Sequence, residues 1–534
     1  APPFSEHMAP VSEQENKPDT PSSDYSAMCP YWDMVDAILG GSAAMRAAGE
    51  KYLPKFEHEV KADYDFRRKT AKFTNVFRDI VESLASKPFA EEAGVSGDNA
   101  SERIKALSED IDGQGNHIHV FAGQTFFRGI AYALDWILVD YTKGISPQAT
   151  IAEEQRIGAR PYWVPLPAKR VLAAYSAMID GKEQFVHVRI QEDYIERDGY
   201  GERCIKQVRI LNREPIGNVE PDSDEPISWA PATYEVWRKE KDTGGKEQWV
   251  LKQSGPISIG VIPLVPFLTG KRKGSSWQVE PSMQDVADLQ IELFQQESGL
   301  KYAKEATAFP MLAGNGVDPL KDEKGNPLPI PVGPKSVLYA PPNTNSNAHG
   351  EWTFIEPDAT SLKFLAEEIE KTIQQMRELG RQPLTAQTGN LTVVTTQFAA
   401  QKGNSAIQAW ALNLKDAMEN ALRYTAMWLK EEAEAEFELP GMKYLRNAGY
   451  DDKAPDVLLE MWKGNGQERA LSTETLLEEM QYRAILSAEF DATKEKQRII
   501  DEMPSDPNEE DIAAAMGGVG GQQDGQMTMD GNNG

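Results

Sequence analysis

Two short motifs hold residues that could bind a phosphate or a metal, but neither has the complete spacing for it. The segment GKRKGSS, residues 270–276, has the glycines and lysines of a phosphate-binding loop. It lacks the GxxxxGK[ST] spacing that places backbone amides and a lysine around a phosphate, so a solvated basic turn is favoured. His117 and His119, in NHIHV, would lie on one side of a strand, but no third metal ligand has a matching spacing. The sequence therefore predicts no metal site.

The acidic, serine and cysteine residues also lack the spacing of a known catalytic site. Adjacent glutamates occur at Glu91–Glu92, Glu367–Glu368 and Glu431–Glu432, where a solvated helix face is favoured over an acid/base pair. The chain has 6 histidines and no Gly-x-Ser-x-Gly motif, so it shows no triad for nucleophilic catalysis. Its 2 cysteines, Cys29 and Cys204, are too few for a disulfide framework and lack metal-ligand spacing. We expect a protein that is not an enzyme and has no cofactor.

One long segment has an unusual charge. Between Leu379 and Lys415 the sequence contains no Asp or Glu, although 83 acidic residues in 534 would place about six there (83 × 37/534). The centre of this segment, TAQTGNLTVVTTQFAAQKGN at residues 385–404, has a single charged residue, Lys402. It lies between two helical patterns and is predicted to be a loop. A structureless loop of this length in a compact domain is uncommon and is usually functional.

The composition is that of a globular chain with roughly two to four structural units. Hydrophobic residues make up 40% of the chain and charged residues 26%. The longest apolar stretch, GIAYALDWILVDY, contains Asp135 and is too short to span a bilayer. The first thirty residues lack the pattern of a secretory signal. We expect no membrane contact, and assembly in a cytoplasm.

The net charge of −27 restricts how the chain could meet nucleic acid. Proteins that hold duplex DNA usually gain affinity from lysines and arginines that release counterions. A chain with 83 acidic and 56 basic residues should on average repel a phosphate backbone. Either nucleic acid is irrelevant to this protein, or the protein handles DNA without gripping it.

The predicted elements change in type along the N-terminal half. Residues 1–30 are predicted to be a flexible arm, and residues 31–138 show mainly helical periodicity. One helical face, which Pro88 ends, is formed by Phe73, Phe77, Ile80 and Leu84. Alternating patterns then predict a meandering antiparallel sheet. Its strands are expected at residues 182–196, 202–212, 232–241, 246–253 and 260–270.

The C-terminal half is predicted to be mostly helical, with one insert that contains strands. Helices are expected over residues 281–307 and 361–379, separated by a Pro-, Gly- and Asn-rich insert with strand candidates at 335–340 and 351–356. A third helix is expected from Ser405 to about Glu434, followed by a short helical pair between Leu471 and Met503. The last residues are predicted to be disordered. The fold class is therefore α+β.

This order of elements resembles the portal proteins of tailed double-stranded DNA bacteriophages. The motifs LGGSAAMRAAGEKYLPK (residues 39–55) and ESLASKPF (residues 82–89) look like one portal subfamily in particular. RPYWVPLPAKRVL and ALSTETLLEEM are similar to the same group, and the resemblance extends over roughly residues 30–505.

The resemblance implies a ring, typically of twelve subunits, with an axial channel for DNA at one vertex of the capsid. Its subunit would have a mainly helical wing with a β-rich portion, two stem helices, a small β-containing clip and a helical crown. The implied boundaries are an arm at 1–30, wing 31–278, first stem helix 281–307, clip 308–358, second stem helix 361–382, tunnel loop 385–404, long helix and return into the wing 405–460, crown 465–505 and disordered tail 506–534.

The resemblance also assigns roles to particular residues. The DNA-facing tunnel loop would present Gly389, Asn390, Thr392, Thr396, Gln397, Lys402 and Gly403. The candidates for lining the channel from the stem are Asp285, Asp288, Glu292, Glu367, Glu368 and Glu370. The clip would meet its partners through Asn315, Lys321, Lys335 and Asn345.

These assignments give the acid-free segment a physical explanation. Acidic residues at a constriction would focus negative potential against incoming DNA. Many lysines would make salt-dependent phosphate contacts that resist sliding. Small polar residues, with Gly389 and Gly403 as flexible ends, suit a contact that neither repels nor holds the duplex.

The implied partners are other copies of the chain in a 12-membered ring, double-stranded DNA bound without sequence specificity, the major capsid protein, a head–tail adaptor and the large terminase subunit. The implied location is the portal vertex of a virion, with a role in DNA packaging and ejection. Two alternatives stay open on the sequence alone. One is an acidic cytoplasmic hydrolase that uses its acidic pairs, and the other is a head–tail or scaffold component without a channel.

Overall fold

A computed structural model describes the chain in two compact units, Ala1–Gly449 and Tyr450–Gly534. The described residues are 16–97, 100–142, 156–217, 227–242, 244–307, 311–316, 321–326, 337–340, 351–355, 360–380, 393–431, 435–442, 445, 454–463, 472–482, 486, 490, 491, 493–495, 497 and 498. Helices and strands occur in largely separate runs, so the predicted α+β class is confirmed.

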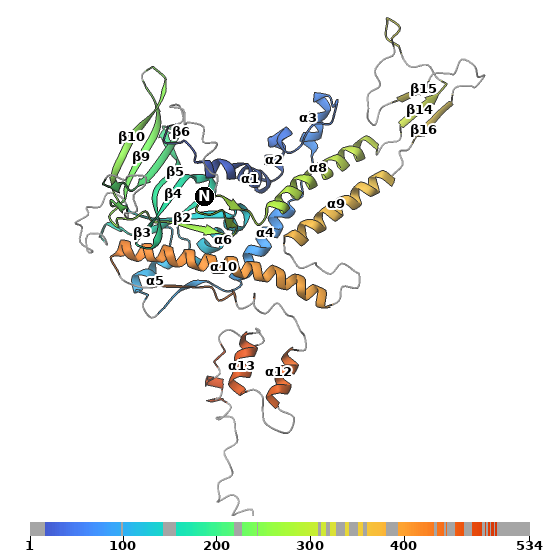
Figure 1. Cartoon of the computed structure of the whole chain (residues 1–534). Helices are drawn as coiled ribbons and strands as arrows, with labels where there is room; N and C mark the ends of the chain where they lie inside the picture. Colours follow the sequence, from blue (N-terminus) through green and yellow to red (C-terminus); the bar gives the residue numbers. More distant parts are fainter. Residues whose placement is uncertain are drawn as a thin grey trace, which may run out of the picture. The chain divides into compact units, whose positions relative to one another are not determined.

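Helices make up the N-terminal part of the first unit, as predicted (Figure 1). They are α1 (Ser23–Leu39), α2 (Gly41–Ala48), α3 (Lys61–Thr70), α4 (Val76–Ser86), α5 (Glu102–Ser108) and α6 (Ile118–Tyr132), with 3-10 turns at Gly49–Lys51, Lys87–Phe89 and Ala168–Arg170. The prediction of a flexible arm is wrong for residues 23–30, which belong to α1. The Ser22 side chain caps this helix by accepting a hydrogen bond from the Tyr25 amide. Residues 1–15 of the predicted arm lie outside the described residues.

The apolar face predicted for α4 is confirmed for three of its four residues; Phe73, the fourth, precedes the helix and is half-buried. Phe77, Ile80 and Leu84 are fully buried, and Asn75 caps the helix by accepting a hydrogen bond from the Arg78 amide. Pro88 lies in the 3-10 turn that follows the helix. The spacing of the apolar side chains therefore located both the helix and its buried side.

The segment after α6 differs from the prediction. Residues expected to continue a helix form strand β2 (Leu134–Tyr141), and the chain turns between α6 and β2 at Ala133, whose φ is 67°. Six consecutive residues of β2 are buried, so the strand has no polar alternation and its sequence resembles a buried helix. Asp135 lies in this strand, fully buried, with an Arg128 nitrogen 3.0 Å from its carboxylate. Burial raises the pKa of the Asp135 carboxyl to about 7, against the opposing effect of Arg128.

Four of the five strands predicted for the antiparallel meander are confirmed, in a five-stranded sheet with the order β10-β9-β6-β5-β4 whose edge strand β4 was not predicted. Its strands are β4 (Val171–Ile179), β5 (Lys182–Asp198), β6 (Gly201–Asn212), β9 (Thr233–Lys241) and β10 (Glu247–Pro256). The last predicted strand, β11 (Leu264–Leu268), joins a different sheet. It pairs with β2, which pairs on its other edge with β3 (Pro161–Pro167).

Short two-stranded pairs complete the strands of the first unit. They are β1 (Gly94–Ser96) with β17 (Glu436–Glu438), β7 (Pro215–Ile216) with β8 (Ser228–Trp229), and β12 (Lys271–Arg272) with β13 (Val279–Glu280). The GKRKGSS segment forms the hairpin between β12 and β13. Arg272 in it is paired with Glu183 and stacks over the Trp277 ring. This segment is therefore a basic turn, and no strand–loop–helix unit surrounds it.

Two helices and an intervening strand module follow the sheets, as predicted. The helices are α8 (Gln284–Thr307) and α9 (Thr360–Leu379), which pack against each other. Between them, β14 (Met311–Asn315) pairs in parallel with β15 (Val337–Ala340) and antiparallel with β16 (Glu351–Ile355). Both strands predicted in the insert are present as β15 and β16.

The third helix, α10 (Val393–Leu429), is longer than predicted. Its predicted start at Ser405 is wrong, because residues 393–404 are helical. The glycine and β-branched residues of this stretch favour a loop by about 1 kcal/mol or less each. They are outweighed because the following turns pack into the core through Ile407, Ala411 and Leu414, and a packed helix can propagate through weak helix formers. The helix ends five residues before the predicted Glu434, next to Lys430 with a φ of 57°.

The core of the first unit is one cluster of buried residues from α1, α4, α6, α8, α10 and both larger sheets. Within it, α10 packs along the three-stranded sheet of β11, β2 and β3. Trp163 on β3 donates a hydrogen bond to the Thr425 hydroxyl of α10 over 2.9 Å. Trp428 on α10 donates to the Val139 carbonyl of β2 over 2.9 Å. These two indole contacts fix α10 along the sheet.

The second unit is a helical pair whose position in the sequence differs from the prediction. Its helices are α12 (Ala454–Lys463) and α13 (Thr473–Tyr482), and Trp462 donates a hydrogen bond to the Thr473 hydroxyl over 3.1 Å. The boundary predicted at 460 is wrong, because α12 crosses it. α13 coincides with the first helix of the predicted pair, and residues 493–495, 497 and 498, which fall in the second, are helical as well. Residues 499–534 lie outside the described residues.

Candidate functional site

The helix pair α8–α9 holds all six residues predicted to line a channel from the stem. Ile369 and Met376 of α9 are buried, as the apolar spacing of this helix predicts. The Thr372 hydroxyl donates a hydrogen bond over 2.9 Å to the Gln296 side-chain oxygen of α8. Gln296 in turn donates to Glu292 over 3.0 Å. A polar chain therefore links the two helices beside their apolar contact.

α8 is also fixed to the helical part of the unit by two buried polar residues. The Gln290 side chain accepts a hydrogen bond from the Phe77 amide and donates one to the Thr74 carbonyl, both over 2.9 Å. The Glu297 carboxylate accepts from the Thr74 amide at 2.9 Å and the Thr74 hydroxyl at 2.7 Å, and lies 2.9 Å from the Lys72 ammonium. Both side chains satisfy backbone groups where the chain enters α4.

The sequence analysis missed these two residues. Gln290 and Glu297 are seven positions apart, so they lie on one face of α8 together with the buried Val286 and Leu293. Polar residues repeated at this spacing within an apolar face were the available signal, because a buried polar side chain needs a hydrogen-bond partner.

The acidic candidates of α8 form a single exposed stripe. Asp285, Asp288 and Glu292 are exposed and follow one another at spacings of three and four residues, which places them on one side of the helix. Gln284 donates to the Asp288 carboxylate over 3.1 Å. The structure therefore brings all three α8 candidates to the same face.

The acidic candidates of α9 are less uniform. Glu367 and Glu370 are exposed, whereas Glu368 is half-buried. Glu368 accepts a hydrogen bond from Lys371 over 2.7 Å, and this bond raises the pKa of the Lys371 ammonium. Because its charge is paired within the helix, Glu368 would contribute less to the potential around α9 than Glu367 or Glu370.

The clip candidates lie in and around the three-stranded module. Asn315 is exposed at the end of β14, opposite Glu351 of β16, and Lys321 is exposed in the following segment. Lys335 and Asn345 lie outside the described residues. The turn after Lys321 is ordered by Asp322, whose carboxylate accepts hydrogen bonds from the Lys324 and Asn326 amides.

The tunnel-loop candidates are divided by the start of α10. Gly389, Asn390 and Thr392 lie outside the described residues. Thr396, Gln397, Lys402 and Gly403 belong to the first three turns of α10. Gly403 is therefore a helical residue, and its predicted role as the flexible end of a loop is wrong. A loop between α9 and α10 can include no more than residues 380–392.

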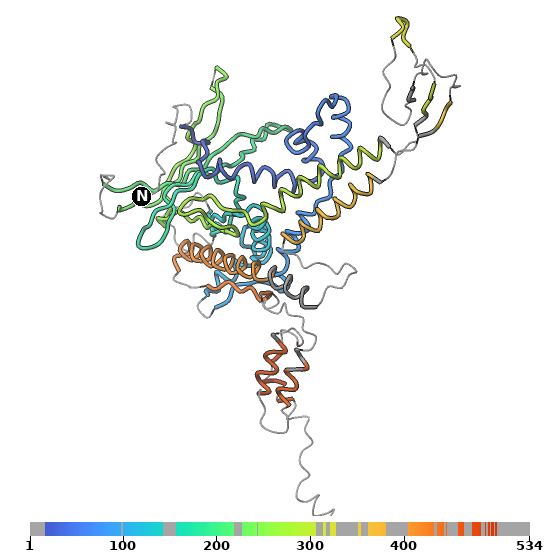
Figure 2. Tube along the Cα trace, turned by 45° about the vertical axis from the view of Figure 1, so that its right-hand side comes forward, coloured from blue at the N-terminus to red at the C-terminus, as the bar shows by residue number. Residues whose placement is uncertain are grey.

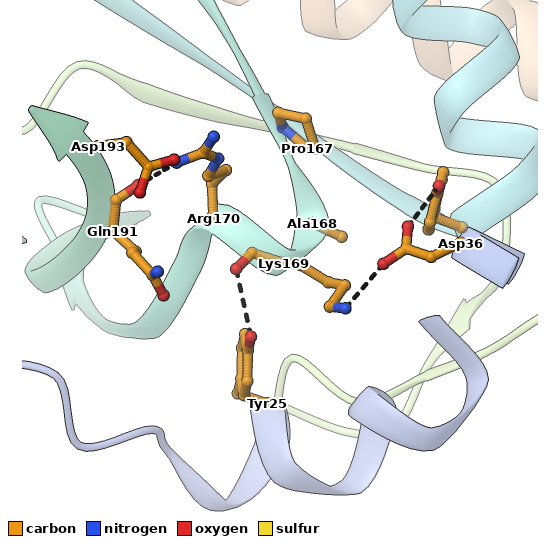
Figure 3. A pocket seen from close by; sticks show the side chains of 9 residues that line it. Tyr25, Asp36, Pro167, Ala168, Lys169, Arg170, Gln191 and Asp193 are labelled. Atoms are coloured by element: carbon orange, nitrogen blue, oxygen red, sulfur yellow. Dashed lines mark hydrogen bonds and ion pairs between the residues drawn. The ribbon is translucent and has the colours of Figure 1, made fainter. Parts of the chain in front are cut away.

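A polar cavity of ≈ 470 Å³ lies where α1 meets the connection from β3 to β4 (Figure 3). Lys169 points toward α1, where its ammonium lies 2.7 Å from both Asp33 and Asp36. Arg170 pairs with Asp193 over 2.8 Å. The hydrogen bond from Lys169 holds the pKa of the Asp33 carboxyl below its usual range. Because acidic side chains neutralise both basic side chains there, we interpret the cavity as part of the packing contact between α1 and the β3–β4 connection, and not as a ligand site.

The two histidines of the NHIHV motif have structural roles at the start of α6. His117 caps the helix, so its predicted position in a strand is wrong. The His119 ring accepts a hydrogen bond from the Ala93 amide over 2.9 Å and packs edge-on against Phe89. Within the described ranges, no three His, Cys, Asp or Glu side chains are grouped so that they could hold a metal ion.

In the same ranges, no helix combines the length and apolarity needed to span a membrane.

Residues 282–429 match DUF4055, a domain of unknown function. Among solved structures, the chain is similar to one described as "Neck of native GTA particle computed with C12 symmetry", with a TM-score of 0.34 and 10% sequence identity. That match covers 83% of this chain and 98% of the other. No curated protein matches the sequence.

The matched domain begins just before α8 and ends with the last residue of α10. It therefore contains the helix pair, the three-stranded module and the long helix, but not the five-stranded sheet or the sheet of β11, β2 and β3.

Proposed function

We propose that this protein is a portal subunit of a tailed, phage-type particle, which forms a ring with an axial channel for double-stranded DNA. The observation that carries the proposal is the α8–insert–α9 arrangement followed by a 37-residue helix. It corresponds in order to the stem, clip, stem and long helix of the portal proteins that the sequence resembles. The motifs at residues 39–55 and 82–89 support the same family independently of this order.

The charge of the helix pair supports a channel wall. Asp285, Asp288 and Glu292 form one exposed stripe. Repeated around a ring, such a stripe would repel the DNA backbone from every side and prevent tight binding. A conduit needs this property because each phosphate contact that forms must break again as the DNA moves.

The remaining roles follow from the proposed position in the particle. The three-stranded module would be the clip, which docks the packaging motor first and the head–tail adaptor later. The residues between α9 and α10 would project into the channel as a shortened tunnel loop. The other parts of the first unit would form the wing that meets the major capsid protein. The subunit would do this work in the virion as a structural component.

The proposal is tested by the size and shape of the purified assembly. Twelve subunits of 59.3 kDa would give a particle of about 710 kDa, with annular images and a central hole in negative stain. A protein that stayed near 59.3 kDa at all concentrations would contradict the proposal. Hydrolase activity that was lost on changing one acidic pair would favour the alternative enzyme.

A further inference from the structure

One exposed apolar surface lies on α3. Phe66 on this helix is 51% exposed, and Val60 and Phe56 just before it are also exposed. Lys69, one turn after Phe66, is exposed as well and has no ion-pair partner among the described residues. We call Phe66 and Lys69 the α3 patch. It combines a large apolar side chain with a positive charge, in a chain whose net charge is strongly negative.

A second exposed apolar surface lies on α9. Phe364 is 59% exposed, and its neighbour Leu365 is exposed too. Glu367, one turn after Phe364, is exposed, and within the described residues no lysine or arginine pairs with it. We call these three residues the α9 patch. Phe364 lies roughly 120–140° around the helix from the buried Ile369 and Met376, so it faces away from the contact with α8.

The two patches have the same spacing between the phenylalanine and the charged residue, and their charges are opposite. In α3 an exposed phenylalanine is followed after three residues by a lysine, and in α9 an exposed phenylalanine is followed after three residues by a glutamate. Residues three apart are neighbours on a helix surface. Two helices packed through Phe66 and Phe364 could therefore also pair Lys69 with Glu367.

The two patches of one chain cannot satisfy each other. α3 and α9 both pack on α8, and they lie on opposite sides of it in both views (Figures 1 and 2). Exposed large apolar side chains of this kind mark interaction surfaces when they are gathered with complementary charges. A second copy of the chain can offer each patch the complement that lies out of reach within the first unit.

We propose that the α3 patch of one copy docks on the α9 patch of the next copy, and that this contact closes the ring. The inference rests on the proposed portal function and names the surfaces that build the ring. A contact between two different patches is head-to-tail, and such a contact generates a closed ring when the rotation per copy is correct. A symmetric dimer would instead need each patch to complement itself, which two lysines or two glutamates in apposition would oppose.

Charge reversal tests the proposed pairing. We expect Lys69→Glu and Glu367→Lys each to raise the protein concentration at which half of the subunits are in rings by about tenfold, because like charges would face each other. The double variant should recover assembly. Lys246→Glu and Glu202→Lys, which change exposed charges on hairpins of the five-stranded sheet, are matched controls and should assemble normally. Mass photometry over a concentration series measures each outcome. Normal assembly of both single variants, or no recovery in the double variant, would overturn the inference.

Cross-linking tests the same contact without relying on charge. In a background with Cys29→Ala and Cys204→Ser, the pair Phe66→Cys and Phe364→Cys should give a ladder of covalent oligomers up to the full ring. Either cysteine alone should give no ladder. Rings without a ladder would refute this contact and leave the portal function intact. An absence of rings in the wild-type protein, before any substitution, would contradict the portal function itself. Dimers alone from the double-cysteine protein would show a symmetric contact and would also overturn the inference.

Discussion

The two helices of the α8–α9 pair are held in different ways. α8 carries two buried polar side chains, Gln290 and Glu297, which bind backbone groups at the start of α4. α9 has an exposed ion pair with the same region, between Arg377 and Asp79, and it leaves Phe364 and Leu365 uncovered. α8 is therefore fixed by buried polar contacts within the chain, whereas α9 leaves part of its apolar surface exposed. In the proposed ring, this difference would separate the contacts that fold the subunit from the contacts that assemble it.

The largest expected effect comes from breaking the α8 anchor. Glu297→Ala would leave the Thr74 amide and hydroxyl without their acceptor and Lys72 without its partner. We expect the free energy of unfolding of the first unit to fall by about 3 kcal/mol, since losing one member of a buried charged contact is costly. Urea unfolding followed by tryptophan fluorescence measures this. Glu370→Ala, which changes an exposed acid on α9, is the control and should cost less than about 0.5 kcal/mol. Equal effects of the two substitutions would remove the distinction between the helices.

The dependence of stability on pH tests a second buried acidic residue, Asp135. The pKa of Asp135 is raised in the folded protein, so its carboxyl stabilises the fold most when protonated, and this contribution is lost as the pH rises through about 7. The stability of the wild type relative to Asp135→Asn should therefore fall by about 2–3 kcal/mol between pH 5 and pH 8. A difference that stayed constant or grew with pH would show that Arg128 dominates over burial.

The second anchor of α8 should have a somewhat smaller effect because it is uncharged. Gln290→Ala would leave the buried Phe77 amide and Thr74 carbonyl unsatisfied, at a cost of about 2 kcal/mol. Gln295→Ala is the matched control. Gln295 also donates to a backbone carbonyl, that of Tyr52, but it is exposed, so water can replace its contact. Thermal or urea unfolding of the two variants side by side would show whether burial sets the cost.

The smallest effect on stability is expected for the exposed acidic stripe, where the effect on DNA should be large. Replacing Asp285, Asp288 and Glu292 together with lysine should change the unfolding free energy by less than about 1 kcal/mol. It should turn a ring that does not hold duplex DNA into one that binds it, with an affinity that falls steeply between 50 and 200 mM salt. Fluorescence anisotropy with a labelled duplex measures this. Unchanged DNA binding by intact variant rings would mean that the stripe does not face the channel.

The sequence predicted the elements whose apolar pattern is regular. The meander of β5, β6, β9 and β10 and the helices α8 and α9 were located within a few residues, because their apolar residues recur at the period of a strand or of a helix. β2 was assigned to a helix because its residues are buried on both sides, and burial of this kind removes the alternation that identifies a strand.

The candidate site was predictable only where charge and spacing determine it. The stripe of Asp285, Asp288 and Glu292 is visible in the sequence, since residues three and four apart share a helix face. The start of α10 was not, because tertiary packing of its later turns overrides the local preference of Thr, Val and Gly for a loop. The partners of Gln290 and Glu297 lie more than two hundred positions away in the sequence, so a single chain without structure could not reveal them.

The pairing within the strand module has a consequence for how such proteins diverge. β14 and β16, the first and last strands of the insert, are hydrogen-bonded to each other from Met311–Ile355 to Asn315–Glu351. The chain therefore leaves α8 and returns to α9 through neighbouring strands. The pairing of β14 with β16 fixes the distance between these two points of the chain. Insertions, deletions or whole grafted domains beyond it, for example at the exposed turn around Gly325, would not change the distance between the two helices. If the module is the clip, as proposed, its outer part could thus change to suit a new partner without altering the helix pair.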